Sequence, residues 1–205
     1  MIHHNRQAIF THIARTGGSS IETAFYGTDY WLINSNEKHI PAAVARKLYE
    51  PYWKSYYKFS IVRNPFDRFR SLWKYSGHYG LYLNDNGEIE LDKYLKFWGY
   101  PYVVEVNSYV NVDVTEFYRT SLRLRDGALY GNLLRDDVEV FKFEDFPKIW
   151  SVLGEKTGIN TVNAPFTEKS MEAKPPLSDK AMEIIREIHD KDFDTFGYSR
   201  DYTNK

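Results

Sequence analysis

The sequence predicts an α/β fold with a mainly parallel central sheet flanked by helices. Short apolar runs that indicate buried strands alternate with segments whose apolar residues recur every three or four positions, as in amphipathic helices. This alternation is typical of parallel sheets covered by helices. Because no linker, internal repeat or low-complexity tract divides the 205 residues, we expect one domain over residues 1–205.

The predicted elements follow one another along the chain at short spacing. They are a strand over 7–13, a helix to about residue 26, a helix over 40–49, a strand over 57–62, a helix from residue 64, a helix over 91–98, a strand over 138–143, a helix over 146–157 and a helix from residue 178. After the first strand, Gly17 and Gly18 break the chain, and Ser19 or Ser20 can cap the helix that follows. Pro41 lies near the first turn of its helix, where no N–H is needed.

The strand over 57–62 is continuously apolar, and Asn64-Pro65 begins the next helix, with Asn64 as its cap. The apolar stripe of that helix consists of Phe66, Phe69, Leu72 and Trp73. Residues 77–136 are harder to order, although 84–87 form a turn signal, Asn-Asp-Asn-Gly.

In the last third, Asp145 is the predicted cap of the helix over 146–157, which ends near Gly158. Residues 161–176 are polar and contain three prolines, so we expect a loop. Ser178 caps the final predicted helix, whose apolar face carries Leu177, Ala181, Ile184, Ile185 and Ile188.

Composition excludes several classes of function. The net charge is −1, from 27 basic and 28 acidic side chains, so we expect no general nucleic-acid binding. Cysteine is absent, which excludes a thiolate metal site and a cysteine nucleophile, and no other metal-ligand cluster is evident. No apolar run approaches the roughly 18 residues of a membrane span, and the first residues lack the apolar run of a signal peptide. We therefore expect a cytoplasmic protein without a bound metal.

A first anion site is predicted where the first strand meets its helix. The residues there are Arg15, Thr16, Gly17, Gly18, Ser19 and Ser20. Glycines allow close backbone approach, the helix start offers free N–H groups, and the remaining side chains are a guanidinium and hydroxyls. This set suits phosphate or sulfate, although an ordinary strand-to-helix turn remains an alternative. The lysine of an NTPase loop is missing after Gly18, and Ile21 stands where a dinucleotide fingerprint needs glycine.

A second anion site is predicted at the end of the second strand. Arg63 ends this strand, and an arginine there is costly without a partner. Ser71 lies two turns into the following helix, on the face shared by Asn64, Asp67 and Arg68. Arg68 and Arg70 add basic character, with at least one of them pairing with Asp67 or lying in solvent. Two anion sites at the carboxyl ends of two strands suggest one ligand with two anionic groups, such as a nucleotide modified at both its 5′ and 3′ positions.

These two segments resemble the cofactor motifs of sulfotransferases that use 3′-phosphoadenosine-5′-phosphosulfate (PAPS). Residues 12–20 are similar to the loop H-[IV]-P-K-T-G-G-[TS]-S, and residues 62–71 are similar to V-R-[ND]-P-x-[DE]-R-x-x-S. Lys38-His39, residues 140–146 and residues 192–198 extend the resemblance, which is closest to the carbohydrate branch that includes heparan sulfate O-sulfotransferases and their bacterial relatives. The resemblance implies a P-loop-like three-layer sandwich.

The resemblance also implies a role for each motif. Thr16, Gly17, Gly18, Ser19 and Ser20 would hold the 5′-phosphosulfate, while Arg63 and Ser71 would hold the 3′-phosphate. Arg15 stands where the family usually has a lysine that neutralises charge on the leaving oxygen, and Ala14 replaces the usual proline. Arginine keeps the positive charge but is bulkier and does not lose its proton.

His39 is the predicted general base, because the resembling branch has a histidine there and imidazole titrates near neutral pH. A surface histidine that begins the next helix is the alternative for His39. Glu37 and His78 are weaker candidates, and His12 is expected to be structural. The acceptor is expected to be a small molecule or a glycan, in a chain that is 17% aromatic. The residues that could stack on a sugar ring are Tyr30, Trp31, Trp98, Tyr100 and Tyr102, with an ordinary core or surface aromatic as the alternative for each.

Two other functions remain open at this point. A nucleotide or nucleoside kinase shares the strand–loop–helix geometry, but it would need the loop lysine and a magnesium-binding aspartate at a strand end. A non-catalytic nucleotide-binding module would keep the site without transfer. The reaction expected from the resemblance is in-line sulfuryl transfer, in which positioned donors stabilise the leaving oxygen.

Overall fold

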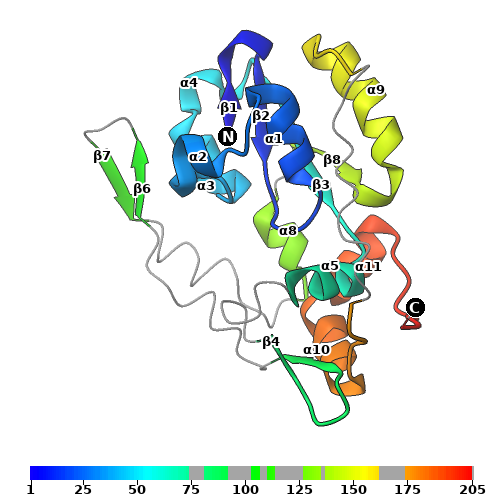
Figure 1. Ribbon diagram of the computed structural model, residues 1–205. Coiled ribbons are helices and arrows are strands. Elements are labelled where there is room, and N and C mark those ends of the chain that lie inside the picture. Colours follow the sequence, from blue (N-terminus) through cyan, green and yellow to red (C-terminus); the bar gives the residue numbers. More distant parts are fainter. Residues whose placement is uncertain are drawn as a thin grey trace. The chain divides into compact units, whose positions relative to one another are not determined.

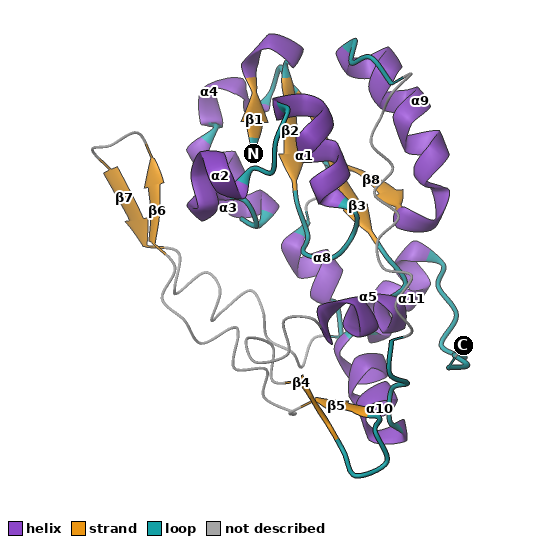
Figure 2. Cartoon of the chain, in the orientation of Figure 1, coloured by secondary structure: helices purple, strands orange, loops and turns teal. Residues whose placement is uncertain are grey.

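The computed structural model describes residues 1–73, 81–91, 103–106, 110–113, 127–134, 137–161 and 174–204 (Figures 1 and 2). The chain divides into two compact units. The first unit comprises Met1–Arg63, Val103–Val112 and Leu133–Lys169, and the second comprises Asn64–Tyr102, Asp113–Asn132 and Ser170–Lys205. The expectation of a single domain stays a prediction.

A four-stranded sheet forms the centre of the first unit, and its elements are coloured blue to yellow in Figure 1. Its strands are β1 (Ile2–His3), β2 (Ala8–Thr11), β3 (Tyr57–Val62) and β8 (Glu139–Lys142), in that order across the sheet. The β1 strand is antiparallel to β2, whereas β2, β3 and β8 are parallel. The prediction of an α/β fold with a mainly parallel sheet is therefore confirmed. The three parallel strands end at the same edge.

One face of this sheet packs against two helices, α1 (Gly18–Tyr26) and α9 (Phe146–Thr157). Alternate residues of β2 and β3 point to this face, as the period of a strand requires. The buried cluster between the sheet and the helices includes Ala8, Phe10, Phe59 and Ile61 from the strands, Ile21 from α1, and Phe146, Ile149, Trp150 and Leu153 from α9. This packing fixes the position of the α1 N-terminus at the edge where β2 and β3 end.

Four further elements of the first unit lie between β2 and β3 in the sequence. They are α2 (Trp31–Asn34), the 3-10 helix η2 (Ser35–Glu37), α3 (Ala42–Leu48) and α4 (Glu50–Trp53). The helix predicted over 40–49 is α3, and Pro41, predicted near its first turn, is its N-cap residue. The first unit also contains the 3-10 helices η1 (His4–Arg6) and η7 (Phe143–Asp145), and the paired strands β6 (Val103–Val106) and β7 (Val110–Asp113), whose last residue falls in the second unit.

One predicted helix cap in the first unit was wrong, and a second is confirmed in its position but not in its hydrogen bond. The N-cap of α1 is Gly17, in the left-handed conformation, so Ser19 and Ser20 lie inside the helix. The glycine reverses the chain direction directly, which leaves the serines no capping position to fill. Asp145 stands at the N-cap of α9 but makes no capping hydrogen bond with its side chain, whereas Gly158 ends α9 as predicted.

The second unit contains α5 (Pro65–Leu72), β4 (Leu81–Leu83), β5 (Ile89–Leu91), most of α8 (Leu129–Leu133), α10 (Asp179–Ile188) and α11 (Asp190–Phe196). The N-caps predicted for α5 and α10 are confirmed. The side chain of Asn64 accepts from the N–H groups of Phe66 and Asp67, and that of Ser178 accepts from Ala181. The predicted apolar face of α10 is buried.

The remaining predictions for the second unit have mixed outcomes. The turn at 84–87 is confirmed and joins β4 to β5. The helix predicted over 91–98 begins on Leu91, which is the last residue of β5, and residues 92–98 lie outside the described part of the chain. Most of the loop predicted over 161–176 also lies outside it. Helix α11 was not predicted.

Candidate functional site

The loop between β2 and α1 has a backbone that suits close approach to a ligand. Gly17 has φ +86°, and a Cβ there would come within 2.7 Å of Phe146 and 2.8 Å of Phe143. Both its conformation and its neighbours therefore require glycine. Arg15 has φ +68°, which is uncommon for a residue with a side chain. The loop thus holds two left-handed residues directly before the helix.

Gly18, the first residue of α1, lies against the imidazole ring of His12. A Cβ at Gly18 would overlap three ring atoms of His12. The ring is buried, stacks on Phe10 with centroids 5.3 Å apart, and packs on the backbone of the first helical turn. The interpretation of His12 as a structural residue agrees with these contacts.

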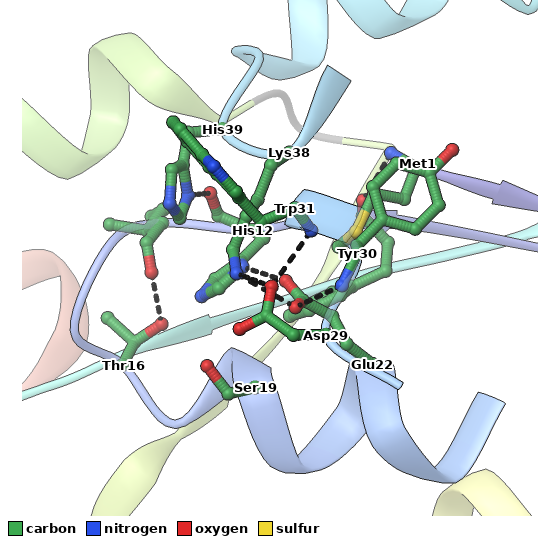
Figure 3. Close-up of polar contacts among 12 residues, drawn as sticks. Met1, His12, Thr16, Ser19, Glu22, Asp29, Tyr30, Trp31, Lys38 and His39 are labelled. Atoms are coloured by element: carbon green, nitrogen blue, oxygen red, sulfur yellow. Dashed lines mark hydrogen bonds and ion pairs between the residues drawn. The ribbon is translucent and has the colours of Figure 1, made fainter. Parts of the chain in front are cut away.

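The hydrogen-bond donors of the loop differ in their exposure and in the partners that they already have. The first turn of α1 offers backbone N–H groups, as every helix start does. Ser19 is exposed and Ser20 is buried. Thr16 is completely buried, and its hydroxyl donates to the carbonyl of Ile13 at 2.7 Å (Figure 3). Any contact of Thr16 with a bound anion therefore falls to its backbone N–H.

Arg63 reaches this loop from the neighbouring strand. It follows β3 directly, and its Nη1 donates to the carbonyl of Arg15 at 3.4 Å. Its guanidinium carbon lies 4.3 Å from the centroid of the Phe143 ring, in a cation–π arrangement. Since Phe143 also borders Gly17, the structure brings the strand end at Arg63 and the loop at Arg15 together around one aromatic ring.

Ser71 lies on α5 of the second unit, where its side chain is buried. The prediction for its neighbours was partly wrong. Arg68 is buried rather than solvated, with its guanidinium near the rings of Phe69 and Tyr130. The Asp67 carboxylate accepts from the hydroxyl of Tyr202, to which Arg70 also donates. Of these partners, Tyr130 and Tyr202 are distant in the sequence, so helix periodicity did not reveal them.

His39 lies on the other side of the first loop. Its Nδ1 is 3.1 Å from the carbonyl oxygen of His12, and the two imidazole centroids are 4.5 Å apart (Figure 3). A carbonyl oxygen only accepts hydrogen bonds, so the neutral ring carries its proton on Nδ1 and leaves Nε2 as the basic nitrogen. Burial holds the pKa of His39 well below its ordinary value, and His12 and Lys38 lower it further.

A buried network of charges lies behind His12, and the sequence did not reveal it. The carboxylate of Glu22, on α1, is inaccessible to solvent, and its Oε1 accepts from Nδ1 of His12 at 2.6 Å. Its Oε2 accepts from the N–H of Tyr30 and pairs with Nζ of Lys38, both at 3.0 Å. Lys38 also pairs with Asp29. Burial alone would raise the pKa of Glu22, but the hydrogen bond and the charge of His12, together with Tyr30 and Lys38, leave it lowered.

Glu37, the weaker candidate base, is engaged in structure. Its carboxylate accepts from the hydroxyls of Tyr49 and Tyr30 and from the side-chain amide of Asn34. These donors tie the turn at 30–37 to α3. His78, the other weaker candidate, lies outside the described residues.

The aromatic residues predicted to stack on the acceptor differ in their exposure to solvent, and three of them lie outside the described residues. Tyr30 is buried, whereas the side chain of Trp31 is 56% exposed. Trp98, Tyr100 and Tyr102 lie outside the described residues. Of the described aromatic candidates, Trp31 alone therefore offers a ring face to solvent near His39 in the sequence.

Within the described ranges, no group of three or more His, Asp or Glu side chains is arranged to hold a metal ion. No helix in that part of the chain has the length and apolar composition needed to cross a membrane.

A comparison with protein-family models matches residues 1–85 to the sulfotransferase family. The matched region contains the loop at 15–20, His39, Arg63 and Ser71. No curated protein and no solved structure matched the chain.

Proposed function

We propose, from the sulfotransferase family that residues 1–85 indicate, that the protein transfers a sulfuryl group from PAPS to a hydroxyl of a carbohydrate acceptor. The observation that carries the proposal is the meeting of Arg63 and the Arg15–Gly17 turn around Phe143, with His39 bonded to the other end of the same loop. This arrangement combines an anion site with a neutral imidazole, the two groups that sulfuryl transfer requires.

The donor set fits the 5′-phosphosulfate of PAPS. Residues 15–20 contain a guanidinium, three hydroxyls and the first N–H groups of α1, and no carboxylate. An N-terminal helix turn favours an anion through its free N–H groups and its dipole. The nearest described carboxylate on the same helix, Glu22, is buried and its charge is offset by Lys38. PAPS, when bound, supplies the sulfuryl group that is transferred.

Each residue of the loop then has a defined task. Gly17, Gly18 and the backbone of Thr16 bring N–H groups to the phosphosulfate, and Ser19 adds its exposed hydroxyl. Arg15 stabilises negative charge on the leaving oxygen by hydrogen bonding and charge. Arg63 holds the 3′-phosphate, and Ser71 shares that task in the proposal. Such preorganised donors supply most of the catalysis in group transfer of this kind.

His39 is proposed to accept the proton of the acceptor hydroxyl at Nε2. Its bond to the His12 carbonyl orients the ring and keeps Nδ1 protonated. A lowered pKa keeps the ring neutral at physiological pH, so the base is ready before the acceptor binds. The resemblance to the carbohydrate branch and the exposed Trp31 ring support a sugar as the acceptor, because sugars stack on indole faces.

Two measurements test the proposal. Calorimetry with 3′-phosphoadenosine-5′-phosphate and with ATP–Mg²⁺ should show binding of the first ligand and at least tenfold weaker binding of the second. Tighter binding of ATP–Mg²⁺ would indicate the kinase alternative. A panel of glycans, phenols and simple alcohols with labelled PAPS should show transfer to a glycan. Labelling of phenols alone would overturn the carbohydrate assignment, and binding without transfer to any acceptor would favour the non-catalytic module.

A further inference from the structure

We propose that the buried pair of Glu22 and Lys38 positions His39 and balances the charge beside its ring, an inference that rests on the role proposed above for His39. Neither residue belongs to the two cofactor motifs. Both are positioning residues, because they act through their neighbours and not on the reacting atoms.

Glu22 holds the two segments between which His39 lies. Its Oε1 receives the N–H of the His12 ring at 2.6 Å, and the carbonyl of this same His12 receives Nδ1–H of His39. Its Oε2 binds Lys38, the residue directly before His39, at 3.0 Å. One carboxylate on α1 therefore fixes both the hydrogen-bond acceptor of His39 and the backbone that carries it.

Lys38 completes the arrangement from the other side. Its side chain is 7% exposed, and it pairs with Asp29 as well as with Glu22. Asp29 in turn accepts from the N–H of Trp31 at 2.8 Å, and Glu22 accepts from the N–H of Tyr30. The turn from Asp29 to Lys38 is thus held to α1 by bonds to buried charges (Figure 3).

The two charges act on His39 with opposite signs. The titratable and charged groups that face it are His12 at the end of β2, Lys38 on its own segment and Glu22 on α1. Burial lowers the pKa of His39 most, the positive charges of His12 and Lys38 lower it further, and the hydrogen bond to the His12 carbonyl and the charge of Glu22 raise it. Removing Glu22 leaves Lys38 with the part-exposed Asp29 as its partner, and removing Lys38 leaves Glu22 with the N–H groups of His12 and Tyr30. Either change therefore unbalances the charge beside His39.

This gives a test that a purely structural role would not pass. Glu22→Gln is nearly isosteric and removes the negative charge that raises the pKa of His39, so this pKa should fall. Lys38→Met removes the cation and leaves Glu22, so the pKa of His39 should rise, with a shift on the order of one pH unit for a charge at this range. The double variant removes both charges and should return His39 close to its wild-type titration.

The measurement is NMR of the histidine rings across pH, with His39→Ala used to assign the His39 signal. Ring ¹⁵N shifts report the tautomer and should show the proton on Nδ1 in the wild-type protein. Two exposed substitutions with the same charge changes, Glu50→Gln and Lys47→Met, are the matched controls and should leave the titration unchanged, since solvent screens exposed charges.

Opposite shifts in the single variants, cancelled in the double variant, support the proposal. Shifts of the same sign, or none, overturn it. If Glu22→Gln fails to fold, Lys38→Met and the double variant still decide between these outcomes, because the double variant buries no lone charge. Absence of any transfer in the wild-type protein, with the opposite shifts observed, would remove the proposed function and leave the pair intact. Sulfuryl transfer by the wild-type protein without these pKa shifts would support the proposed function and overturn the role of the pair.

Discussion

Nδ1 of His39 donates to the carbonyl oxygen of His12 at 3.1 Å. This bond joins the candidate base to His12, which follows β2 and leads into the anion loop. It also determines which ring nitrogen is basic, because the carbonyl leaves only Nε2 able to accept a proton. The base and the anion site are therefore positioned by the same few residues of backbone.

The first prediction concerns the pH dependence of turnover. A base works in its neutral form, and the pKa of His39 lies well below the ordinary 6.5. Activity should therefore stay constant from about pH 8 down to 6.5 and decline only as the pH falls through the lowered pKa. The measurement is kcat/KM across pH under saturating donor. An acidic limb centred at or above 6.5 would contradict the role of His39, and the limb should be absent from the residual activity of His39→Ala.

A second prediction separates the chemical and conformational roles of Arg15. Arg15→Lys should keep turnover within about tenfold, since a cation remains, whereas Arg15→Met should lose on the order of 10²–10³ in kcat. Arg15→Gly should be equally inactive but should unfold at the same temperature as the wild-type protein or above it, because glycine adopts φ +68° without strain. Thermal unfolding and turnover of the three variants check this. Full activity of Arg15→Met would show that the side chain is not needed.

A third prediction concerns the contact of Gly18 with His12. Gly18→Ala places a methyl group in the buried imidazole, so unfolding free energy should fall by about 1–3 kcal/mol. Gly154→Ala is the matched control, because a Cβ there would meet Thr161 at an ordinary 3.6 Å and alanine favours the helix by about 1 kcal/mol. Urea unfolding measures both. Equal stability of the two variants would mean that His12 is free to move away.

A fourth prediction concerns the second unit and stability in acid. His189 is completely buried and donates to Asp192 at 2.7 Å, and burial lowers its pKa below 6.5 although Asp192 opposes the shift. The unfolded chain therefore takes up a proton first as the pH falls. The contribution of the neutral, buried His189 to the free energy of unfolding is complete above about pH 6.5. It is lost as the pH falls from there through the lowered pKa of His189.

Urea unfolding at pH 7.5 and 5.5 measures this loss. His12 and His39 also have lowered pKa values, so the wild-type protein should be less stable at pH 5.5. His189→Asn keeps a donor for Asp192 and should reduce the difference between the two pH values. The same substitution at the exposed His4 should not. An unchanged difference in His189→Asn would assign the acid sensitivity to the other histidines.

Local chemistry allowed the three parallel strands of the sheet and five of the helices to be predicted, namely α1, α3, α5, α9 and α10. The strand over 57–62 matches β3, and the caps Asn64 and Ser178 form the bonds expected of them. These features depend on neighbours within three or four residues. The exception is the α1 cap, where the left-handed conformation of Gly17 takes precedence over the capping preference of the serines.

The charge network could not be predicted in the same way. Glu22 bonds to residues ten before it and sixteen after it, and none of these spacings lies on one helix face. In the sequence, Glu22 has the pattern of a solvated helix residue, and only the packing of α1 against the ends of β2 and of the turn at 29–38 buries it. The candidate loop and His39 could be predicted from the sequence, but Glu22 and Lys38, whose bonds position them, could not.

The central claim is sulfuryl transfer assisted by His39, and labelled-sulfate transfer from PAPS to a glycan tests it most directly. The wild-type protein should transfer label, and His39→Ala should lose at least 10²-fold in rate while still binding 3′-phosphoadenosine-5′-phosphate as tightly. Transfer by His39→Ala at the wild-type rate, or no transfer by the wild-type protein to any acceptor, would contradict the account.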